Sequence, residues 1–219
     1  MKIPKNWTFK DDGIAKGFND HVREQLPWYD LMTQAVVHFG RHYIPNGGII
    51  YDIGASTGNI GNALREVIES RKASLIAIEE SKEMVKQYTG GGEIITADVT
   101  DFDFQPFDFG VVFLVLMFIP IAKRGKLIHR LIQLIKPGGC MIIIDKIHTP
   151  SGYYGTVARR LTMQMKMDAG ANAEAVIEKE LSLAGYQRPI DPLILSPYAK
   201  QFFQLGEFAG WIIEARANE

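Results

Sequence analysis

The stretch that decides the fold is "IIYDIGASTGNIG", Ile49 to Gly61. A short, isoleucine-rich apolar run reaches Asp52, and glycines follow at once. Such a run is typical of a buried strand, and from Asn59 onward apolar residues recur every three to four positions, which is typical of a helix. Strand, glycine turn and helix together predict a loop whose backbone leaves room for a ligand.

The same alternation continues along the chain. The apolar runs lack a clean period of two, which predicts strands buried on both faces and therefore a mostly parallel α/β sheet with helices on both sides. The expected strands are "GGIIYDIG", "ASLIAIEE", "GEIITADV", "FDFGVVFLVLMFI" and "CMIIIDKI", separated by the expected helices "NIGNALREVIESRK", "SKEMVKQYTGGG" and "AKRGKLIHRLIQLIK".

The flanking segments complete the expected organisation. Residues before Gly48 look helical around Pro27, and we expect them to form a cap outside the sheet. "GYYGTVARRLTMQMKMDAG" and "ANAEAVIEKELSLAG" predict two late helices, and the last segment predicts an antiparallel hairpin around Gly206 at one sheet edge. We therefore expect a helical cap or lid over 1–46 and a ligand-binding domain over 47–219, within one structural domain.

Composition excludes several classes of protein. The net charge is -1, so nothing indicates a dedicated nucleic-acid binder, although adjacent Arg159 and Arg160 leave a local basic patch open. The single cysteine, Cys140, forms no internal disulfide, and no histidine or cysteine cluster has zinc spacing, so we expect no metal. No apolar signal core or bilayer-length run is present, which predicts a cytoplasmic protein with no membrane partner.

The glycine loop is the first candidate for ligand binding. Ligands of an open α/β sheet bind beyond the carboxyl ends of its strands. Asp52, Gly54, Ser56 and Gly58 form the pattern D-x-G-x-S-x-G. Gly54 permits a sharp turn, Ser56 and Gly58 let a ligand approach the backbone, and the free N–H groups of the following helix suit a carboxylate.

Two further acids close the next two strands. Glu79 ends the second strand, where a carboxylate would accept hydrogen bonds from ribose hydroxyls. Asp98 ends the third, in "ITADV". A single acid after a strand is as often a helix cap or turn residue. Acids at three successive strand ends beside a glycine loop predict a nucleotide site.

Other nucleotide classes match less well. A phosphate-binding P-loop needs G-K-[ST], which is absent. Ser56 and Asn59 replace the second and third glycines of the dinucleotide fingerprint. The remaining glycine spacing is closer to an NAD-dependent short-chain reductase, but no tyrosine has a lysine four residues on, as the acid/base pair of that class would require. We therefore rank hydride transfer by a reductase well below the other functions considered for the site.

Five ordered motifs resemble a known family. "YDIGASTG", "IAIEES", "ADVTDFDF", "FDFGVVFLVLMF" and "LIKPGGCMIIID" resemble those of class I S-adenosylmethionine-dependent methyltransferases. The resemblance implies a Rossmann-like, seven-stranded, mostly parallel sheet with an antiparallel last strand. It also implies S-adenosylmethionine as cofactor and S-adenosylhomocysteine as product. "WTFKDDGIAKGFNDHVREQLPWYDL" and "LGEFAGWIIEA" further resemble one branch, the carboxy-S-adenosylmethionine synthases of tRNA wobble-uridine modification.

The resemblance implies roles for individual residues. Tyr29 matches a cap tyrosine that closes over the cofactor, and Phe113 stands where the branch has an asparagine after the fourth strand. The other implied cofactor-binding residues are Gly54, Ala55 and Ser56 at the methionine part, Glu79 with neighbouring Glu80 at the ribose, and Asp98 with Val99 beside the adenine.

One departure from the branch shapes the expected function. The synthase has an arginine in its later helical region that pairs with the carboxylate of its unusual cofactor, and "DAGANAEAVIEKELSLAGYQ" contains none. A buried carboxylate without a cationic partner is costly. We therefore expect a methyltransferase that uses the ordinary donor and a small-molecule acceptor. The alternatives are a synthase acting on S-adenosylmethionine and prephenate, a user of the carboxylated cofactor, or a non-catalytic cofactor-binding module; a homodimer stays open.

No catalytic residue follows from the sequence. Methyl transfer is a displacement at a sulfonium carbon, so the enzyme mainly aligns donor and acceptor, and a general base is needed only if the acceptor must lose a proton. Candidates for such a base near the fifth strand are Asp145, His148, Tyr153 and Tyr154.

Overall fold

The computed structural model describes residues 3–149 and 151–215, and its centre is one seven-stranded sheet with the order β3-β2-β1-β4-β5-β7-β6. The strands β1 to β5 run parallel, and β7 is antiparallel to both β5 and β6. This is the sheet that the motif resemblance implied. The strands are β1 (Ile49–Ile53), β2 (Ser74–Glu79), β3 (Glu93–Thr96), β4 (Phe107–Phe113), β5 (Ile135–Lys146), β6 (Ala199–Leu205) and β7 (Phe208–Glu214).

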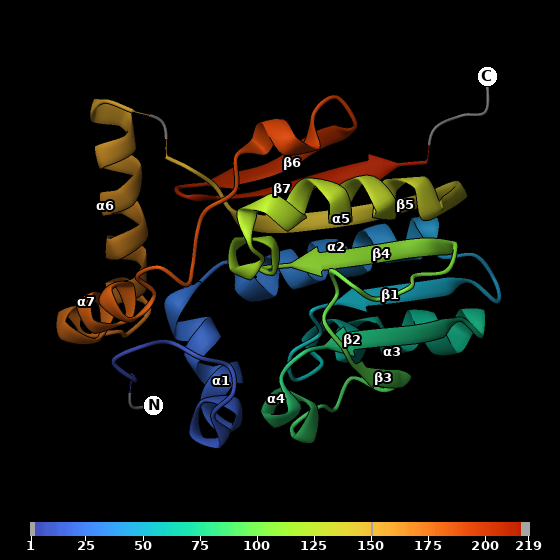
Figure 1. The fold of residues 1–219 in the computed structure, drawn as a ribbon, viewed down its shortest axis with the longest axis horizontal. Helices are drawn as coiled ribbons and strands as arrows, with labels where there is room; N and C mark the ends of the chain where they lie inside the picture. The colour runs from blue at the N-terminus through green and yellow to red at the C-terminus, as the bar shows by residue number, and fades with distance from the viewer. Residues whose placement is uncertain (1–2, 150, 216–219) are drawn as a thin grey trace.

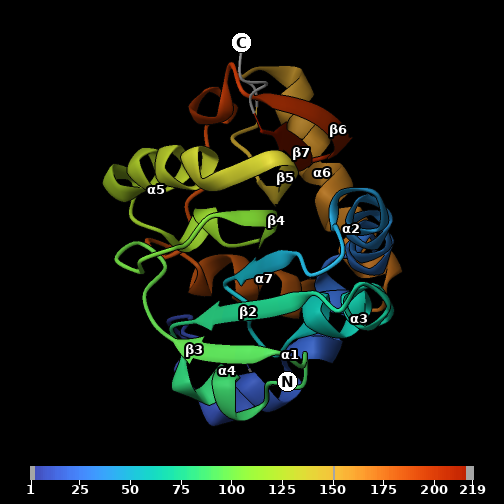
Figure 2. The ribbon, with the colours of Figure 1, turned by 90° about the vertical axis from the view of Figure 1, so that its right-hand side faces the viewer.

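Helices cover both faces and the carboxyl edge of the sheet. Figure 2 shows α2 and α3 on one side of the sheet and α5 on the other. Figure 1 shows α1, α6 and α7 gathered where the arrowheads of β1 and β4 point. The helices are α1 (Asp12–Gln25), α2 (Tyr29–Tyr43), α3 (Asn59–Arg71), α4 (Lys82–Lys86), α5 (Ile121–Leu134), α6 (Tyr153–Asp168) and α7 (Ala173–Ser182), with 3-10 turns η1 (Leu116–Phe118) and η2 (Pro192–Leu195).

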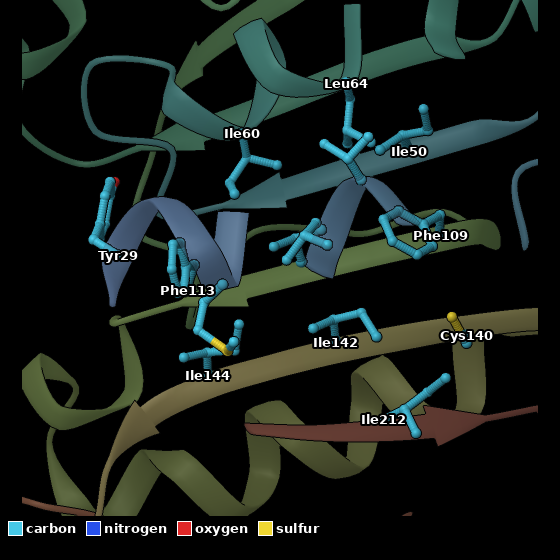
Figure 3. Close-up of a cluster of buried hydrophobic side chains, with 14 of the residues drawn as sticks. Tyr29, Ile50, Ile60, Leu64, Phe109, Phe113, Cys140, Ile142, Ile144 and Ile212 are labelled. Carbon is cyan, nitrogen blue, oxygen red and sulfur yellow. The ribbon is translucent and has the colours of Figure 1, made fainter. Parts of the chain in front are cut away.

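Two apolar layers, one on each face of the central strands, form most of the core, and a smaller cluster joins α1 to α4 through Ile14 and Met84. On the α2–α3 side, Leu64 of α3 lies with Ile50 of β1 and Phe109 of β4, all fully buried (Figure 3). Every residue of β4 is buried. Burial on both faces explains why these strands show no alternation in the sequence.

Two boundaries differ from the sequence prediction, and one predicted element is confirmed. The fourth apolar run was expected to form one strand through Ile119, but β4 ends at Phe113 because Leu114 adopts a left-handed φ of +62°. Ile135 was expected on the stripe of the preceding helix and instead begins β5, opposite Phe107. The predicted edge hairpin around Gly206 is present as β6 and β7.

The expected cap divides into two parts in the structure. The α2 helix packs directly on the sheet: Val36 and Val37 are buried in the same apolar layer as strands β4 and β5. Helix α1 instead lies beside the carboxyl ends of the strands (Figure 1). Helix α1 lies where a lid could close, and the lid role predicted for 1–46, including Tyr29, stays a prediction.

Candidate functional site

A cavity of about 260 Å³ lies at the carboxyl ends of β1, β2 and β4. Its walls include residues of α1, α6 and α7, which close the side opposite the strands. The cavity brings together ten of the residues predicted to bind the cofactor, namely Tyr29, Asp52, Gly54, Ala55, Ser56, Glu79, Glu80, Asp98, Val99 and Phe113.

The loop after β1 is shaped by two left-handed residues. Gly54 has a φ of +76°, and a Cβ atom there would lie 2.5 Å from Val115 Cγ2, so the position requires glycine. Ser56 has a φ of +50°, which is unusual for a residue with a side chain. Its N–H donates a 2.9 Å hydrogen bond to Glu79 Oε2. This bond ties the loop to the end of β2.

Gly58 is not among the residues that line the cavity. It has a φ of +93°, and a Cβ atom there would overlap the backbone of Gly90. The structure thus gives Gly58 a packing role between two loops, and its predicted cofactor contact stays a prediction.

The Glu79 carboxylate is fixed at the cavity wall by backbone donors. Besides the bond from Ser56, its Oε1 accepts a 2.8 Å hydrogen bond from the Ser81 N–H. Burial raises the pKa of Glu79, against the effect of these backbone hydrogen bonds. Its neighbour Glu80 also lines the cavity, and its carboxylate pairs with Lys10 at 2.7 Å.

Asp52 is the most unusual acid of the site. It is 2% exposed, and its Oδ2 has no hydrogen-bond partner among the described residues. Burial, and secondarily the charge of Glu79, raises its pKa to about 7. An unpartnered buried carboxylate oxygen is costly, so this atom suits a cationic ligand group that the free protein does not supply.

Asp98 and Val99 follow β3. The Asp98 carboxylate accepts a 2.8 Å hydrogen bond from the Thr100 N–H and lies 3.8 Å from Lys123 Nζ. Burial would raise the pKa of Asp98, but the Thr100 hydrogen bonds and Lys123 outweigh it and hold the pKa below its usual value. An ionised acid beside buried Val99 offers an acceptor and an apolar surface together.

Tyr29 and Phe113 form an aromatic wall of the cavity. Their rings stack with centroids 5.1 Å apart and an interplanar angle of 17° (Figure 3). The Arg23 guanidinium lies 5.4 Å from the Tyr29 ring centroid. Burial raises the pKa of the Tyr29 hydroxyl, so the side chain stays neutral.

The four candidate general bases do not line the cavity. Asp145 is fully buried, and its carboxylate accepts the N–H groups of Val115 at 3.1 Å, Leu116 at 2.7 Å and Lys146 at 2.8 Å. It therefore holds the turn after β4 rather than a substrate. Tyr153 and Tyr154 are exposed on α6, and exposed His148 lies in a separate surface depression.

Sequence reasoning missed three lysines in the cavity wall. Lys146 ends β5, Lys166 belongs to α6 and Lys179 to α7; all three are buried and line the cavity. The signal was present in the helical periodicity. Lys166 follows Ala158 and Thr162 on the buried stripe of α6, and Lys179 follows Val176 on that of α7. A lysine within such a stripe indicates a polar cavity beside it.

Comparisons with known proteins identify the family of the chain. A family model described as a methyltransferase domain matches residues 50–139. A carboxy-S-adenosyl-L-methionine synthase of Staphylococcus epidermidis is 30% identical over 192 residues, which cover 85% of this chain and 84% of the relative. The chain belongs to the class I S-adenosylmethionine-dependent methyltransferase family. It is thus an enzyme that uses S-adenosylmethionine, and it is similar to the synthase branch.

Solved structures share the fold at low sequence identity. An O-methyltransferase family protein of Burkholderia thailandensis aligns with a TM-score of 0.62 and 14% identity, covering 94% of this chain and 60% of its own. A plantazolicin methyltransferase bound to S-adenosylhomocysteine aligns with a TM-score of 0.62 and 12% identity, covering 93% and 90%.

Two negative findings apply to the described residues only. None of the helices within 3–149 and 151–215 has the length and hydropathy that a membrane span requires. In the same ranges, no three histidine, cysteine or acidic side chains group closely enough to hold a metal ion.

Proposed function

We propose that the cavity holds S-adenosylmethionine with its ribose at Glu79, its adenine beside Asp98 and Val99, and its cationic amino-acid end near Asp52. The observation that carries this proposal is the convergence of three acids from three strand ends on one cavity. The unpartnered Oδ2 of Asp52 supports the assignment, because a ligand ammonium would satisfy it.

We further propose methyl transfer to a small-molecule acceptor. The cofactor, when bound, supplies an electrophilic methyl group. The residues of the chain bind and orient the two reactants in a largely apolar cavity, which is the main requirement of a displacement at carbon. The acceptor would enter on the side of α1, α6 and α7, which carry none of the predicted cofactor-binding residues.

A carboxy-S-adenosylmethionine synthase is the second candidate. Two observations favour it: the 30% identity to the Staphylococcus epidermidis synthase, and the three buried lysines of the cavity, which offer cations where the sequence lacks the arginine of that branch. The absence of that arginine is therefore a weaker reason against a synthase than the sequence alone suggested.

Product analysis separates the two candidates. The purified protein is incubated with S-adenosylmethionine, either with prephenate or with fractionated small-molecule extract, and the nucleosides are identified by mass spectrometry. We expect S-adenosylhomocysteine, formed in amounts that depend on an extract fraction. A carboxylated S-adenosylmethionine formed from prephenate would instead establish the synthase.

A further inference from the structure

The three buried lysines form a cluster that the cofactor assignment does not use. Lys166 Nζ lies 2.8 Å from Glu180 Oε1, and Lys146 Nζ lies 3.7 Å from Glu180 Oε2 and 3.1 Å from Gln187 Oε1. Lys179 lies next to Glu180 on α7 and faces the same cavity. These residues come from three different elements and meet only in the folded chain.

The charges of this lysine cluster do not balance. Lys146 and Lys166 share one carboxylate, that of Glu180, and no carboxylate of the described residues pairs with Lys179. Glu207 does not supply the missing negative charge, because it pairs with Arg159, whose Nε lies 3.6 Å from Glu207 Oε1. Uncompensated cations in a buried wall are costly unless a partner of opposite charge completes them.

Lys179 is the member without an acidic partner. Among the described residues its Nζ has no hydrogen bond and no carboxylate within 4.0 Å; it lies over the ring of Trp7. Two neighbours on α1 are also unsatisfied: His21 Nε2 and Gln25 Oε1 are buried without partners in the described structure, and both residues line the cavity. A ligand that accepts hydrogen bonds would satisfy Lys179 and, in the tautomer protonated at Nε2, His21, whereas Gln25 Oε1 is an acceptor and would need a donor group.

We propose that the lysine cluster of Lys146, Lys166 and Lys179 binds a carboxylate or phosphate group of the methyl acceptor. The proposal rests on the proposed function, since it assigns the acceptor end of the same cavity. If the lysine cluster binds such a group, the methyl acceptor is a small anion. Ammonium groups and a buried imidazole make short, charge-assisted hydrogen bonds to such groups.

The pKa values of the lysine cluster predict that a proton is taken up when an anion binds. Burial, and then the charge of Lys166, lowers the pKa of Lys179 to about 5. Burial, with Lys179 and Lys166, lowers the pKa of His21 to about 3. Glu180 acts on Lys179 in the opposite sense and raises its pKa, but burial and Lys166 outweigh it. A bound anion would raise the pKa of Lys179, so anion binding at neutral pH takes up a proton.

The test uses the protein saturated with S-adenosylhomocysteine, titrated by calorimetry with benzoate and, separately, inorganic phosphate. For benzoate, runs in buffers of different ionisation enthalpy report uptake of about one proton per anion bound. Lys179→Met is expected to weaken anion binding at least about tenfold. The matched control is Lys200→Met, because Lys200 is exposed and pairs with Glu214 away from the cavity.

Each outcome has a defined meaning. If S-adenosylhomocysteine does not bind the wild type, the proposed function itself fails. If it binds, but the anions do not, or bind Lys179→Met as well as the wild type, only the lysine-cluster proposal fails. If carboxylated S-adenosylmethionine binds tighter than S-adenosylmethionine and loses that preference in Lys179→Met, the anion belongs to the donor and the acceptor assignment is overturned. If Lys179→Met does not fold, absence of proton uptake by the wild type contradicts the proposal.

Discussion

Glu79 and Asp98 lie at opposite ends of the proposed nucleoside position, and each offers a carboxylate that the protein has already oriented. Replacing either by alanine removes a charge-assisted acceptor for the ligand. We expect the affinity for S-adenosylhomocysteine to fall about 10- to 100-fold for each variant, since hydrogen bonds to charged groups contribute about 1.5–3 kcal/mol. Isothermal calorimetry measures this change.

Asp101→Ala is the matched control for Asp98→Ala. Asp101 is an exposed acid of the same loop and also lies near Lys123, at 3.5 Å. Its removal should leave the affinity within about twofold, as expected for an exposed ion pair. Equal losses in the Asp98 and Asp101 variants would contradict a specific role of Asp98.

The raised pKa of Asp52 predicts that the free energy of unfolding depends on pH. Its raised pKa of about 7 means that the folded protein binds more protons than the unfolded chain between pH about 4 and 7. The contribution of Asp52 to the free energy of unfolding is therefore present below pH about 4 and is lost as pH rises through about 7.

Binding of a cationic ligand reverses the preference of Asp52, because the ionised carboxylate pairs with the ammonium. We expect the affinity for S-adenosylhomocysteine to rise about tenfold between pH 6 and 8, and to be nearly flat in Asp52→Asn. Calorimetric titrations across this range measure it. The same slope in the wild type and in Asp52→Asn would assign the dependence to another group.

The acids could be read from the sequence because each follows an apolar run, and parallel strands end at one edge. The lysines could not, because Lys146, Lys166 and Lys179 are separated along the chain and meet only through the packing of α6 and α7. The prediction for Asp145 was wrong in the opposite way. Its position at a strand end suggested a general base, but its carboxylate accepts hydrogen bonds from three backbone N–H groups.

At the scale of elements, the turn between β4 and η1 depends on β5. Asp145→Ala would leave the N–H groups of Val115 and Leu116 without their acceptor in a buried turn. We expect the free energy of unfolding to fall by about 3 kcal/mol, measured by urea denaturation. Asp103→Ala, at an exposed position, should change it by less than about 0.5 kcal/mol. Similar values for both variants would show that the turn does not need Asp145.

Helix α1 predicts a closing motion. Its residues His21, Val22 and Gln25 line the cavity, whereas α2 packs on the sheet with Val36 and Val37 in a core layer. Binding of S-adenosylhomocysteine should slow amide hydrogen exchange in α1 more than in α5, which covers a sheet face away from the cavity. Mass spectrometry of exchanged peptides checks this. Unchanged exchange in α1 would remove the lid role.

The elements also show where the sequence patterns lose precision. The run after Asp108 is apolar past the end of β4, so hydrophobicity alone could not reveal the left-handed turn at Leu114. Helix α2 was predicted to lie outside the sheet, because its own sequence does not indicate which element its apolar face contacts. In the structure that face packs in one apolar layer with residues of α3, β4 and β5.

At the scale of the whole molecule, the strand order reverses between β1 and β4, because β2 and β3 follow β1 on one side and β4 and β5 lie on the other. Ligands of open α/β sheets bind at such a switch point, so the topology itself favours the cavity as the cofactor site. The ordered motifs were sufficient to predict this sheet. The acceptor end could not be predicted in the same way, because α1, α6 and α7 build it from outside the motif region.

A structure of the protein with S-adenosylhomocysteine bound is the decisive experiment for the proposed cofactor site. We expect the ligand in the cavity, with its ribose hydroxyls donating to Glu79, its ammonium at Asp52, its adenine beside Asp98, and Tyr29 in contact with the bound nucleoside. A ligand bound elsewhere, or bound in the cavity without any contact to Glu79 and Asp52, would contradict it.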